Sequence, residues 1–566
     1  MKTLRRQLAD TNTSGPADVA PSTVLHLAYI VHGQARITTN IGSDTPTYRE
    51  ATAGQHATEW KAATDSELAS LVDAGTFTLC ALPPGFKAIG GKWVLKIKRG
   101  AGGEIIKFKA RFVAQGFLQR YGVDYVDTYA PVARIPSIRI IIALTAHHDW
   151  ELHQMDVKSA YLNGDLEEEI YMHQPEGYAA PGKEQHVWKL NKSLYGLKQA
   201  GRTWHHKIDV ALKRRGFTTL DADHCVYVRR RTDSVIIIAL YVDDLLIASN
   251  NLADLTQFKS DLSSEFKMED LGEATFILGV KIERDRVART ITIGQSAYVT
   301  ALLDRHGMTD CKPVTAPMDL SSTVLQLVKA PEGHQSPQDE TRDYQSIIGG
   351  IMFAMLCTRP DIAFAVTTLS QFASNPMPAH AQALKRVLRY LKGTINHSIT
   401  YIGTGSVDSQ PPLIGYSDAD WAQSHDRRSV TGYAFLLCGG AISWQSKKQR
   451  TVALSTVEAE YMATTHAAKE AIWWRSVLGG LGYDVSIPTT LWSDSQGSIS
   501  LAGNPEHHAR TKHIDIQYHF IRQHLAEKTI SLRFIGTEDM AADCLTKALE
   551  RVRHEKGTRM LGMQRV

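Results

Sequence analysis

At 566 residues, the chain is long enough for three or four domains. Its hydrophobic fraction of 43% and charged fraction of 22% are ordinary for a globular protein and supply apolar material for several cores. A net charge of +4 indicates no particular class of partner. The six cysteines stand far apart without a CxxC pair, which argues against a zinc ribbon or a disulfide scaffold and favours a reducing, intracellular compartment.

The N-terminal part of the sequence carries no membrane signal. No segment approaches the roughly 20 consecutive apolar residues of a spanning helix, and no apolar stretch follows the first basic residues. We therefore expect a soluble protein with no membrane partner. Residues 1–57 are rich in small and polar side chains with weak periodicity, which predicts a poorly ordered leader. Apolar residues then recur at helical spacing, so a helix is expected over residues 59–74.

A basic segment follows, in which residues 92–120 contain eight Lys or Arg and a single acid, Glu104. Alternating apolar and basic residues on either side of a glycine-rich stretch predict a β-hairpin. Two interpretations stay open for its charge. It could be a solvated, lysine-rich edge that discourages aggregation, or a clamp on the phosphate oxygens of a nucleic acid or a triphosphate.

Two later strand patterns carry aspartates. Residues 151–157 (ELHQMDV) alternate as a strand and place Asp156 near its end. Residues 235–250 (VIIIALYVDDLLIASN) predict a buried hairpin with Asp243 and Asp244 at its centre. Charged carboxylates are rarely buried without a partner, and no Lys or Arg lies within eight residues of this pair. A divalent metal such as Mg²⁺ resolves the repulsion, because it binds carboxylates together with substrate phosphates.

Asp156 on one strand and the paired aspartates on a hairpin favour phosphoryl transfer. A lone aspartate at a strand end is more often a cap or a paired core residue. Carboxylates on adjacent strands, however, can hold two ions roughly 3.5–4 Å apart. One ion then lowers the pKa of an attacking hydroxyl group, and the other stabilises the leaving oxygen.

A second constellation of acids lies in the C-terminal third. A polar linker is expected at residues 319–343, and helical apolar spacing follows over 344–412. From residue 413 the pattern predicts three strands, a helix, a strand, a helix, a strand and a helix. The acids that can converge on one edge of that sheet and hold two Mg²⁺ are Asp418, Glu460, Asp494 and Asp543. Ser455 and Glu458 form a capping-box pattern, so Glu458 is expected to cap a helix, while Asp420 is expected near the metals without being a principal ligand.

A set of short strings occurs in one order along the chain. They are GKWVLKIKR (91–99), KARFVAQGF (109–117), ELHQMDVKSAYLNGDL (151–166), SLYGLKQA (193–200), LYVDDLLIA (240–248), MEDLGEATFILGV (268–280), TRPDIAFAV (358–366), RVLRYLKGT (386–394), SDADWA (417–422), STVEAEYMA (455–463) and RTKHIDIQYHFIR (510–522). The ordered set resembles the reverse transcriptase and ribonuclease H part of copia-type LTR retrotransposon Pol polyproteins. No aspartic protease or integrase zinc signature is found, so we expect the C-terminal part of a polyprotein or a truncated copy.

The resemblance implies an α+β multidomain fold. A right-hand polymerase with fingers, palm and thumb, and with a two-metal palm hairpin, would be followed by a ribonuclease H-like mixed α/β domain. The implied units are the leader at 1–57, fingers and palm at 58–318, the linker at 319–343, a helical thumb or connection region at 344–412, the ribonuclease H domain at 413–550 and a C-terminal tail at 551–566.

The resemblance also implies roles for single residues. Two sets of acids are expected to be catalytic and to bind Mg²⁺ or Mn²⁺, two ions per site: Asp156, Asp243 and Asp244 in the polymerase, and Asp418, Glu460, Asp494 and Asp543 in the nuclease. Lys98 and Arg111 are expected to grip the nucleotide, with Lys96 or Lys109 as alternatives to Lys98.

Further positions follow from the same motifs. Tyr161 is expected to exclude the ribose 2′-OH by its bulk, with a half-buried core tyrosine as the alternative. Gly196 is expected to let the backbone approach the nascent base pair. Phe276, Leu278 and Gly279 match a primer grip. His513 is an auxiliary residue near the second metal site, or else a capping or core histidine.

The implied function is RNA-directed DNA synthesis from a primer, on RNA or DNA templates and with dNTP substrates, together with cleavage of RNA in RNA–DNA hybrids. The implied partners are an RNA template, a DNA primer, the hybrid and the proteins of a retrotransposon particle, in the cytoplasm with access to the nucleus. Two alternatives stay open. One is a decayed or domesticated copy that only binds nucleic acid, and the other is a chain in which only the nuclease is active. The presence of all seven carboxylates favours an enzyme.

Overall fold

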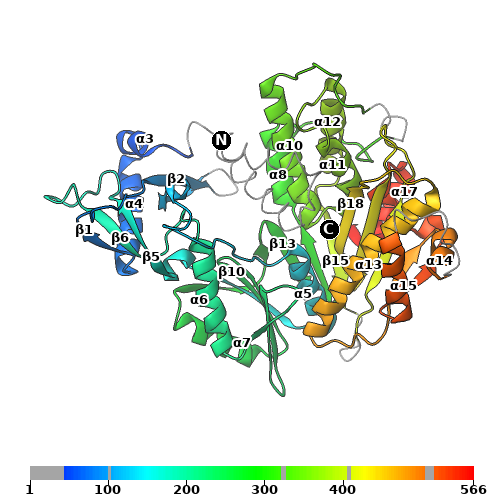
Figure 1. Ribbon diagram of the computed structural model, residues 1–566, viewed down its shortest axis with the longest axis horizontal. Helices are drawn as coiled ribbons and strands as arrows, with labels where there is room; N and C mark the ends of the chain where they lie inside the picture. The colour runs from blue at the N-terminus through cyan, green and yellow to red at the C-terminus, as the bar shows by residue number, and fades with distance from the viewer. Residues whose placement is uncertain (1–43, 100–103, 320–326, 404–409, 504–514) are drawn as a thin grey trace.

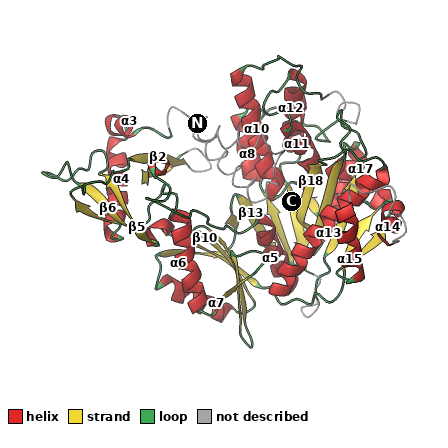
Figure 2. Ribbon diagram, viewed as in Figure 1, coloured by secondary structure: helices red, strands yellow, loops and turns green. Residues whose placement is uncertain are grey.

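A computed structural model describes residues 44–99, 104–319, 327–403, 410–503 and 515–566. Figure 1 shows the N-terminal elements at the left, a sheet with helices below the centre, a group of helices above it and a second α/β layer at the right. Figure 2 shows that strands occur in the left, lower and right parts, whereas the upper part is helical. Within the described ranges, no helix combines the length and the apolar character needed to cross a bilayer.

The left part corresponds to the fingers. Its elements are helices α3 (Tyr48–Ala53) and α4 (Ala57–Asp73), the hairpin of β2 (Gly91–Arg99) and β3 (Ile105–Ala114), and a sheet in the order β1 (Phe77–Cys80), β6 (Val187–Lys192), β5 (Asp165–His173). Trp93, Leu95 and Ile97 alternate into the core of this unit, and the residues between them, Val94 and Lys96, are exposed on the opposite face. Residues 48–53, expected to belong to a poorly ordered leader, form α3 because Tyr48 stacks on Trp93.

The lower part is the palm. Its antiparallel sheet has the order β11 (Met268–Glu273), β4 (Glu151–Val157), β10 (Asp244–Ser249), β9 (Val235–Tyr241), β8 (Val226–Arg230), β7 (Thr218–Thr219). Helices α6 (Ala200–Arg214) and α7 (Leu252–Ser263) cover one face through an apolar cluster that includes Trp204 and Phe258. Helix α5 (Ile135–His148) covers the other face. The predicted hairpin at 235–250 is confirmed as β9 and β10, joined by a turn at Val242 and Asp243.

A third sheet joins segments that are far apart in the sequence. Its order is β12 (Phe276–Ile277), β13 (Val280–Asp285), β14 (Thr290–Gly294), β15 (His397–Ile402), β21 (Met563–Arg565). The expected C-terminal tail is instead helix α17 (Arg551–Met560) and strand β21. Met563 is buried in this sheet and β21 pairs with β15, so the end of the chain is part of the core.

The upper part contains helices α8 (Ser296–Arg305), α10 (Gln338–Cys357), α11 (Ala363–Ser370) and α12 (Pro378–Gly393), with the short 3-10 helix η3 (Pro360–Ile362). They pack around one apolar cluster that includes Ile351, Leu369 and Leu388. Helix α10 begins within the segment expected to be a linker at 319–343, of which residues 320–326 lie outside the described part of the chain.

The right part is the mixed α/β domain that the sequence predicted. Its sheet has the order β18 (Gly440–Lys448), β17 (Val430–Leu437), β16 (Ile414–Ala419), β19 (Thr489–Ser493), β20 (Ile530–Phe534). Its helices are α13 (Thr456–Gly480), α14 (Gln496–Gly503), α15 (Asp515–Ala526) and α16 (Asp543–Thr546). Strands β16 to β18 are antiparallel, whereas β19 and β20 run parallel to β16. The predicted fold class, a polymerase followed by a ribonuclease H-like domain, is confirmed.

Helix α5 joins the palm to this domain. It is buried along nearly its whole length because the palm sheet lies on one side and β15 and β18 lie on the other. The guanidinium group of Arg139 donates to the carbonyl oxygens of Ile442 at 2.7 Å, Leu356 at 2.7 Å and Cys357 at 2.9 Å. It also stacks on the ring of Trp444 at 3.8 Å. Three segments therefore share one buried cation.

Candidate metal centres

The first centre lies where the β9–β10 hairpin meets strand β4. Asp244 begins β10 and is directly opposite Asp156 of β4. Asp243 precedes Asp244 in the turn, so strand pairing brings together the three acids that the sequence singled out. Val242 opens the turn with a φ of 58°, a conformation that β-branched residues rarely adopt.

Two hydrogen bonds hold this turn in place. The indole nitrogen of Trp204, on α6, donates to the carbonyl oxygen of Val242 at 2.6 Å. The carbonyl oxygen of Asp243 accepts from the backbone nitrogen of Val157 at 2.8 Å. Because the turn is tied to α6 on one side and to β4 on the other, the carboxylates project from a rigid support.

Burial and mutual repulsion raise the pKa of two of these carboxyl groups. Burial and the charge of Asp243 raise the pKa of Asp244 to about 6, although a hydrogen bond from Gln154 acts in the opposite direction. The pKa of Asp156 is raised by burial, by Asp243 and by Glu269. At each site, burial and the neighbouring acids outweigh the groups that favour the ionised carboxylate. A cation bound among these groups would favour the ionised form.

Glu269 is an acid of this centre that the sequence reasoning missed. It lies on β11, directly opposite Asp156, and it lines the same cleft. Its carboxylate is 3.4 Å from the ammonium group of Lys158. Only the pairing of β11 with β4 places it here, because its own neighbourhood in the sequence shows no distinguishing spacing.

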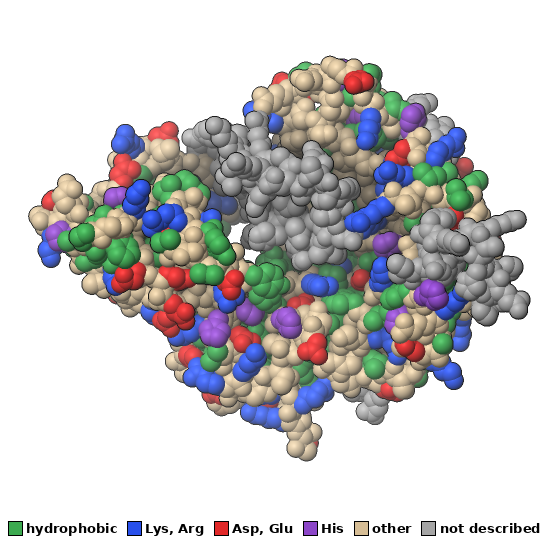
Figure 3. Space-filling view, viewed as in Figure 1, with side chains coloured by type: hydrophobic (Ala, Val, Ile, Leu, Met, Phe, Trp, Pro, Cys, Tyr) green, Lys and Arg blue, Asp and Glu red, His purple; other side chains and the backbone are tan. Residues whose placement is uncertain are grey.

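The carboxylates face a cleft of about 700 Å³ between fingers and palm. The charged residues that line it are Glu67, Asp73, Lys98, Lys107, Lys109, Arg111, Asp156, Lys158, Lys192, Asp243, Lys267 and Glu269. On the face shown in Figure 3, by contrast, basic and acidic side chains are interspersed. The cleft therefore joins a basic hairpin to a group of acids, which favours the phosphate-clamp interpretation of that hairpin over a solvated edge.

The structure separates the candidate nucleotide-binding lysines. Lys98 and Lys109 line the cleft with Arg111, whereas Lys96 is not among its lining residues. The pKa of Lys109 is lowered to about 8 by burial and by the charges of Arg111 and Lys98, which Asp243 partly offsets. Arg111 also lies over the ring of Tyr195 at 4.3 Å. Lys109 is thus a partly buried cation that faces the aspartates across the cleft.

Tyr161 lies on the 3-10 helix η2 (Ala160–Asn163), directly beside the cleft. Its half-buried ring meets Tyr195 edge-on, with centroids 4.9 Å apart. The hydroxyl group of Ser193 donates to its carbonyl oxygen. The side chain thus belongs in part to the fingers core, and its expected selection against the ribose 2′-OH stays a prediction.

The packing around Gly196 explains why this position lacks a side chain. Its φ is 93°, and a Cβ at this position would lie 2.1 Å from the carbonyl oxygen of Ala114 and 2.6 Å from Val113. The backbone of residue 195 also accepts a hydrogen bond from Ala114 at 2.8 Å. The missing side chain therefore accommodates strand β3 of the fingers, and the expected approach of this backbone to the nascent base pair stays a prediction.

The expected primer grip is a tight hairpin between β12 and β13. Leu278 and Gly279 form its turn, with φ of 49° and 80°. Phe276 precedes the turn and is 52% exposed. An exposed aromatic ring on a constrained turn is suited to contact a nucleic-acid strand.

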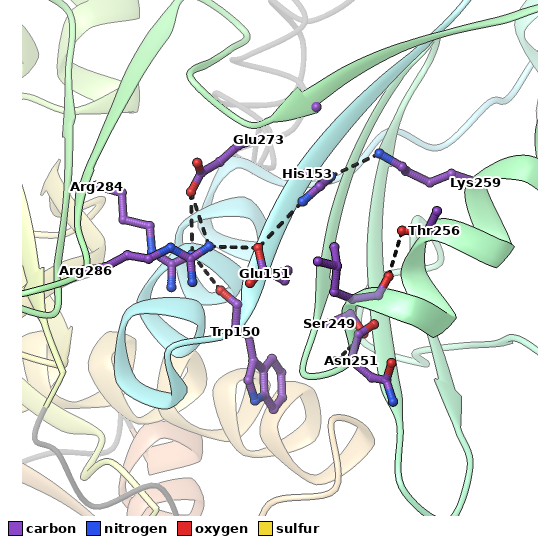
Figure 4. Close-up of polar contacts among 12 residues, drawn as sticks. Trp150, Glu151, His153, Ser249, Asn251, Thr256, Lys259, Glu273, Arg284 and Arg286 are labelled. Carbon is purple, nitrogen blue, oxygen red and sulfur yellow. Dashed lines mark hydrogen bonds and ion pairs between the residues drawn. The ribbon is translucent and has the colours of Figure 1, made fainter.

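A network of ion pairs fixes this hairpin to the palm (Figure 4). Arg284 of β13 donates to the carbonyl oxygen of Trp150 at 2.6 Å and is 2.5 Å from the carboxylate of Asp149. Arg286, in the turn directly after β13, is 2.7 Å from Glu151 of β4. Figure 4 shows the two arginines reaching together toward the start of β4. Strand β13 of this hairpin is thus tied to the start of β4, the strand that carries Asp156.

The second centre lies at one edge of the mixed sheet. Asp418 is near the end of β16, and Asp494 follows the end of β19, which is parallel to β16. Asp543 begins α16. One ligand oxygen from each of these three residues lies within 4.8 Å of the others, so the group is close enough to hold a metal ion. This convergence agrees with the arrangement predicted from the sequence.

Glu460, on α13, completes the group of four acids. Burial, followed by the charges of Asp418 and Asp494, raises its pKa to about 10. The pKa of Asp418 is raised to about 7, chiefly by burial, while Lys547 lowers it. The Oε2 atom of Glu460 is buried without a hydrogen-bond partner among the described residues. The set of hard oxygen ligands, one of them unsatisfied, fits a divalent ion such as Mg²⁺ or Mn²⁺.

Three further residues were singled out in the sequence in connection with the second centre: Glu458, Asp420 and His513. The side chain of Ser455 accepts from the backbone nitrogen of Glu458, whose carboxylate accepts from the backbone nitrogen of Leu454 at 2.9 Å, so Glu458 caps α13 as expected. Asp420 accepts a hydrogen bond from the backbone of Val430. His513 lies outside the described residues.

Two residues next to Asp543 also enter the second centre, and the sequence reasoning missed both. The hydroxyl group of Thr546 donates to Asp418. The ammonium group of Lys547 is 2.8 Å from Asp543 and 3.7 Å from Asp418. The spacing of four between Asp543 and Lys547, one turn of a helix, is the only signal that could have indicated the second contact.

Comparisons with known proteins show which sequences this chain resembles. Residues 74–320 match the family of the reverse transcriptase (RNA-dependent DNA polymerase). The retrovirus-related Pol polyprotein from transposon TNT 1-94 of Nicotiana tabacum is 43% identical over 507 residues, which cover 88% of this chain and 37% of that protein. The chain therefore spans little more than a third of that relative. A putative transposon Ty5-1 protein of Saccharomyces cerevisiae is 33% identical over 319 residues, covering 56% of this chain and 100% of that protein.

Among solved structures, a foamy viral protease–reverse transcriptase in complex with double-stranded DNA matches with a TM-score of 0.46. It is 13% identical, and the match covers 84% of this chain and 70% of that one.

Proposed function

The chain belongs to the copia-type, retrovirus-related Pol polyproteins of transposons, and from that premise we propose that it performs both RNA-directed DNA synthesis and hydrolysis of RNA in RNA–DNA hybrids. The observation that supports the first activity most directly is the pairing of Asp156 with Asp244 beside Asp243, facing a cleft rimmed by lysines and Arg111. Its substrates would be a primer 3′-OH on an RNA or DNA template and dNTPs.

At the first centre, Asp156 and Asp243 would hold two Mg²⁺ or Mn²⁺ ions, since both line the cleft, and Asp244 would support them from β10. The bound ions would lower the pKa of the primer hydroxyl group and stabilise the leaving pyrophosphate oxygen. Lys109 and Arg111 would bind the triphosphate across the cleft by charge-assisted hydrogen bonds. Tyr161 would lie beneath the incoming sugar and disfavour a 2′-OH.

At the second centre, Asp418, Asp494 and Asp543 would be the principal metal ligands, and Glu460 would complete the set. Thr546 and Lys547 hold Asp418 in position before any metal binds. The substrate is the scissile phosphate of the RNA strand in a hybrid, and water is the nucleophile. We assign the site to hydrolysis because no nucleotide-binding basic hairpin accompanies it among the described residues.

Primer extension on an RNA template tests the first activity. The wild type should extend a DNA primer with dNTPs and Mg²⁺, and Asp243→Asn should reduce the rate by about 10³-fold or more, since a metal ligand is lost. Asp233→Asn, which changes an exposed aspartate in the loop before β9, is the matched control and should extend normally. Equal extension by the wild type and by Asp243→Asn would refute the assignment.

Cleavage of the RNA strand in a labelled hybrid tests the second activity. Asp418→Asn should abolish cleavage and leave primer extension within about twofold of the wild type, because the two centres lie in different sheets. Glu538→Gln, an exposed acid near Asp543, should alter neither activity. Loss of both activities in Asp418→Asn would argue against two independent sites. A wild type that binds hybrid but performs neither reaction would be a nucleic-acid-binding protein.

We also propose that the chain acts inside a retrotransposon particle in the cytoplasm, with its template RNA and particle proteins as partners. The proposal draws on the naming of its relatives as transposon Pol polyproteins. Recovery of the chain in a particle fraction together with element RNA would support it, and exclusive recovery as a free protein would refute it.

A further inference from the structure

A lysine lies within the acid group of the second centre. Lys547 follows α16, and its ammonium group is 2.8 Å from Oδ1 of Asp543 and 3.7 Å from Oδ2 of Asp418. The side chain is 22% exposed, whereas those of the two aspartates are 5% and 1% exposed. Lys547 therefore lies at the mouth of the group and reaches inward between two of the proposed metal ligands.

Lys547 is the cation that these acids share. Its charge acts on the carboxyl groups of Asp418, Asp543 and Glu460, and also on that of Asp420. Arg553 is 3.1 Å from Asp543, and its side chain is half exposed. A buried group of carboxylates is costly without positive charge, and Lys547 is the cation placed between two of them.

The same oxygens would be needed by a metal ion. Mg²⁺ binds its oxygen ligands at roughly 2.0–2.1 Å. One oxygen from each of Asp418, Asp494 and Asp543 lies within 4.8 Å of the others, so these carboxylates would draw closer around an ion. An ion bound to Oδ1 of Asp543 would face an ammonium group on the same oxygen, and the two positive charges would repel each other.

We propose that Lys547 is an internal cation that competes with a divalent metal for Asp543 and Asp418. It stabilises the acid group when no metal is bound, and it must leave Asp543 before a metal can bind there. Lys547 thereby raises the metal concentration at which the second centre is loaded. The inference deepens the proposed nuclease function and concerns the same site.

Metal binding to the second centre alone tests this competition. The chain would carry Asp156→Asn and Asp243→Asn, which remove the first centre, and free Mn²⁺ would be counted by electron paramagnetic resonance without nucleic acid. Lys547→Met keeps the length of the side chain and removes its charge. The Kd for Mn²⁺ should fall by at least about tenfold, because repulsion over roughly 4 Å is relieved. Lys547→Arg, which retains the charge, should stay within about threefold of the parent.

Two controls separate competition from a general effect of charge or folding. Lys556→Met removes a lysine that pairs with the half-exposed Asp539 at 2.8 Å, and it should leave the Kd unchanged. Melting temperatures supply the second control. Without metal, Lys547→Met should melt below the parent chain, and saturating Mg²⁺ should close most of that gap. A lysine with a purely structural role would leave the gap the same with and without metal.

The inference is overturned if Lys547→Met binds Mn²⁺ with an unchanged or a weaker affinity, or if Mg²⁺ leaves the melting gap open. If Lys547→Met does not fold, Lys547→Gln takes its place under the same criteria. Cleavage of the RNA–DNA hybrid by the wild-type chain, which carries none of these substitutions, is measured separately. If Lys547→Met binds Mn²⁺ more tightly but the wild-type chain does not cleave the hybrid, the nuclease function is refuted and the competition stands. If the wild-type chain cleaves the hybrid but Lys547→Met does not bind Mn²⁺ more tightly, the competition is refuted and the nuclease function stands.

Discussion

Replacing Asp361 with Asn should strongly destabilise the chain, because it breaks a fully buried ion pair. Oδ2 of Asp361 is 2.7 Å from Nη2 of Arg359, and the two side chains are 0% and 1% exposed. The hydroxyl group of Tyr390 donates to the same carboxylate at 2.7 Å. Arg359 also donates to the carbonyl oxygen of Thr394 at 3.0 Å. The pair thus connects the end of α10 with α12.

The expected loss is about 3–5 kcal/mol of unfolding free energy, the usual cost of leaving one member of a buried pair uncompensated. Burial alone would raise the pKa of Asp361, but the charge and hydrogen bonds of Arg359 hold it below its ordinary value. A carboxyl group with a lowered pKa stabilises the fold above its unfolded pKa of about 3.9, and this contribution is lost as the pH falls through the folded value. The difference between the wild type and Asp361→Asn should therefore be full at pH 7 and shrink only below about pH 4.

Urea unfolding followed by tryptophan fluorescence measures this loss at several pH values. Asp319→Asn is the matched control, because Asp319 forms an ion pair with Arg386 at the same distance of 2.7 Å but is half exposed. It should cost less than about 1 kcal/mol. Replacing both partners, Arg359→Met with Asp361→Leu, should recover much of the loss, since no unpaired charge remains. A loss below about 1 kcal/mol in Asp361→Asn, or an equal loss in Asp319→Asn, would refute the reasoning.

Three further outcomes are expected. Lys109→Met should raise the KM for dNTP about tenfold in single-nucleotide incorporation. In the wild type, dNTP affinity should decline as the pH rises through about 8, where Lys109 loses its charge, and Lys109→Met should lack this decline. The control Lys96→Met should change neither the KM nor its pH dependence. Gly196→Ala should lower the free energy of unfolding by about 3 kcal/mol, because its Cβ would meet strand β3. Gly182→Ala, also at positive φ but in open space, should cost only about 1–2 kcal/mol. Arg284→Met should cost about 2–3 kcal/mol in urea unfolding and weaken primer binding; a stable variant with normal primer affinity would contradict this.

The amino-acid sequence alone predicted most of the local elements and the acids that form both candidate centres. Alternation of apolar residues reports which face of a strand is buried, so the basic hairpin and the hairpin that carries Asp243 and Asp244 could be predicted from their own residues. The order of strands and helices after residue 413 likewise indicated the mixed sheet. Acids at strand ends without nearby cations pointed to metal binding before any contact was known.

Only the tertiary structure decided which distant groups meet. Glu269 enters the first centre because β11 pairs with β4, and strand β21 completes a sheet with β15, although neither pairing leaves a trace in local periodicity. Gly196 illustrates the same limit, since a glycine in a sequence does not reveal which neighbour occupies the space beside its Cα. Lys547 is the clearest case. Its charge could be read directly, but its place among the carboxylates depends on the packing of α16 against β16, which brings together residues 129 positions apart.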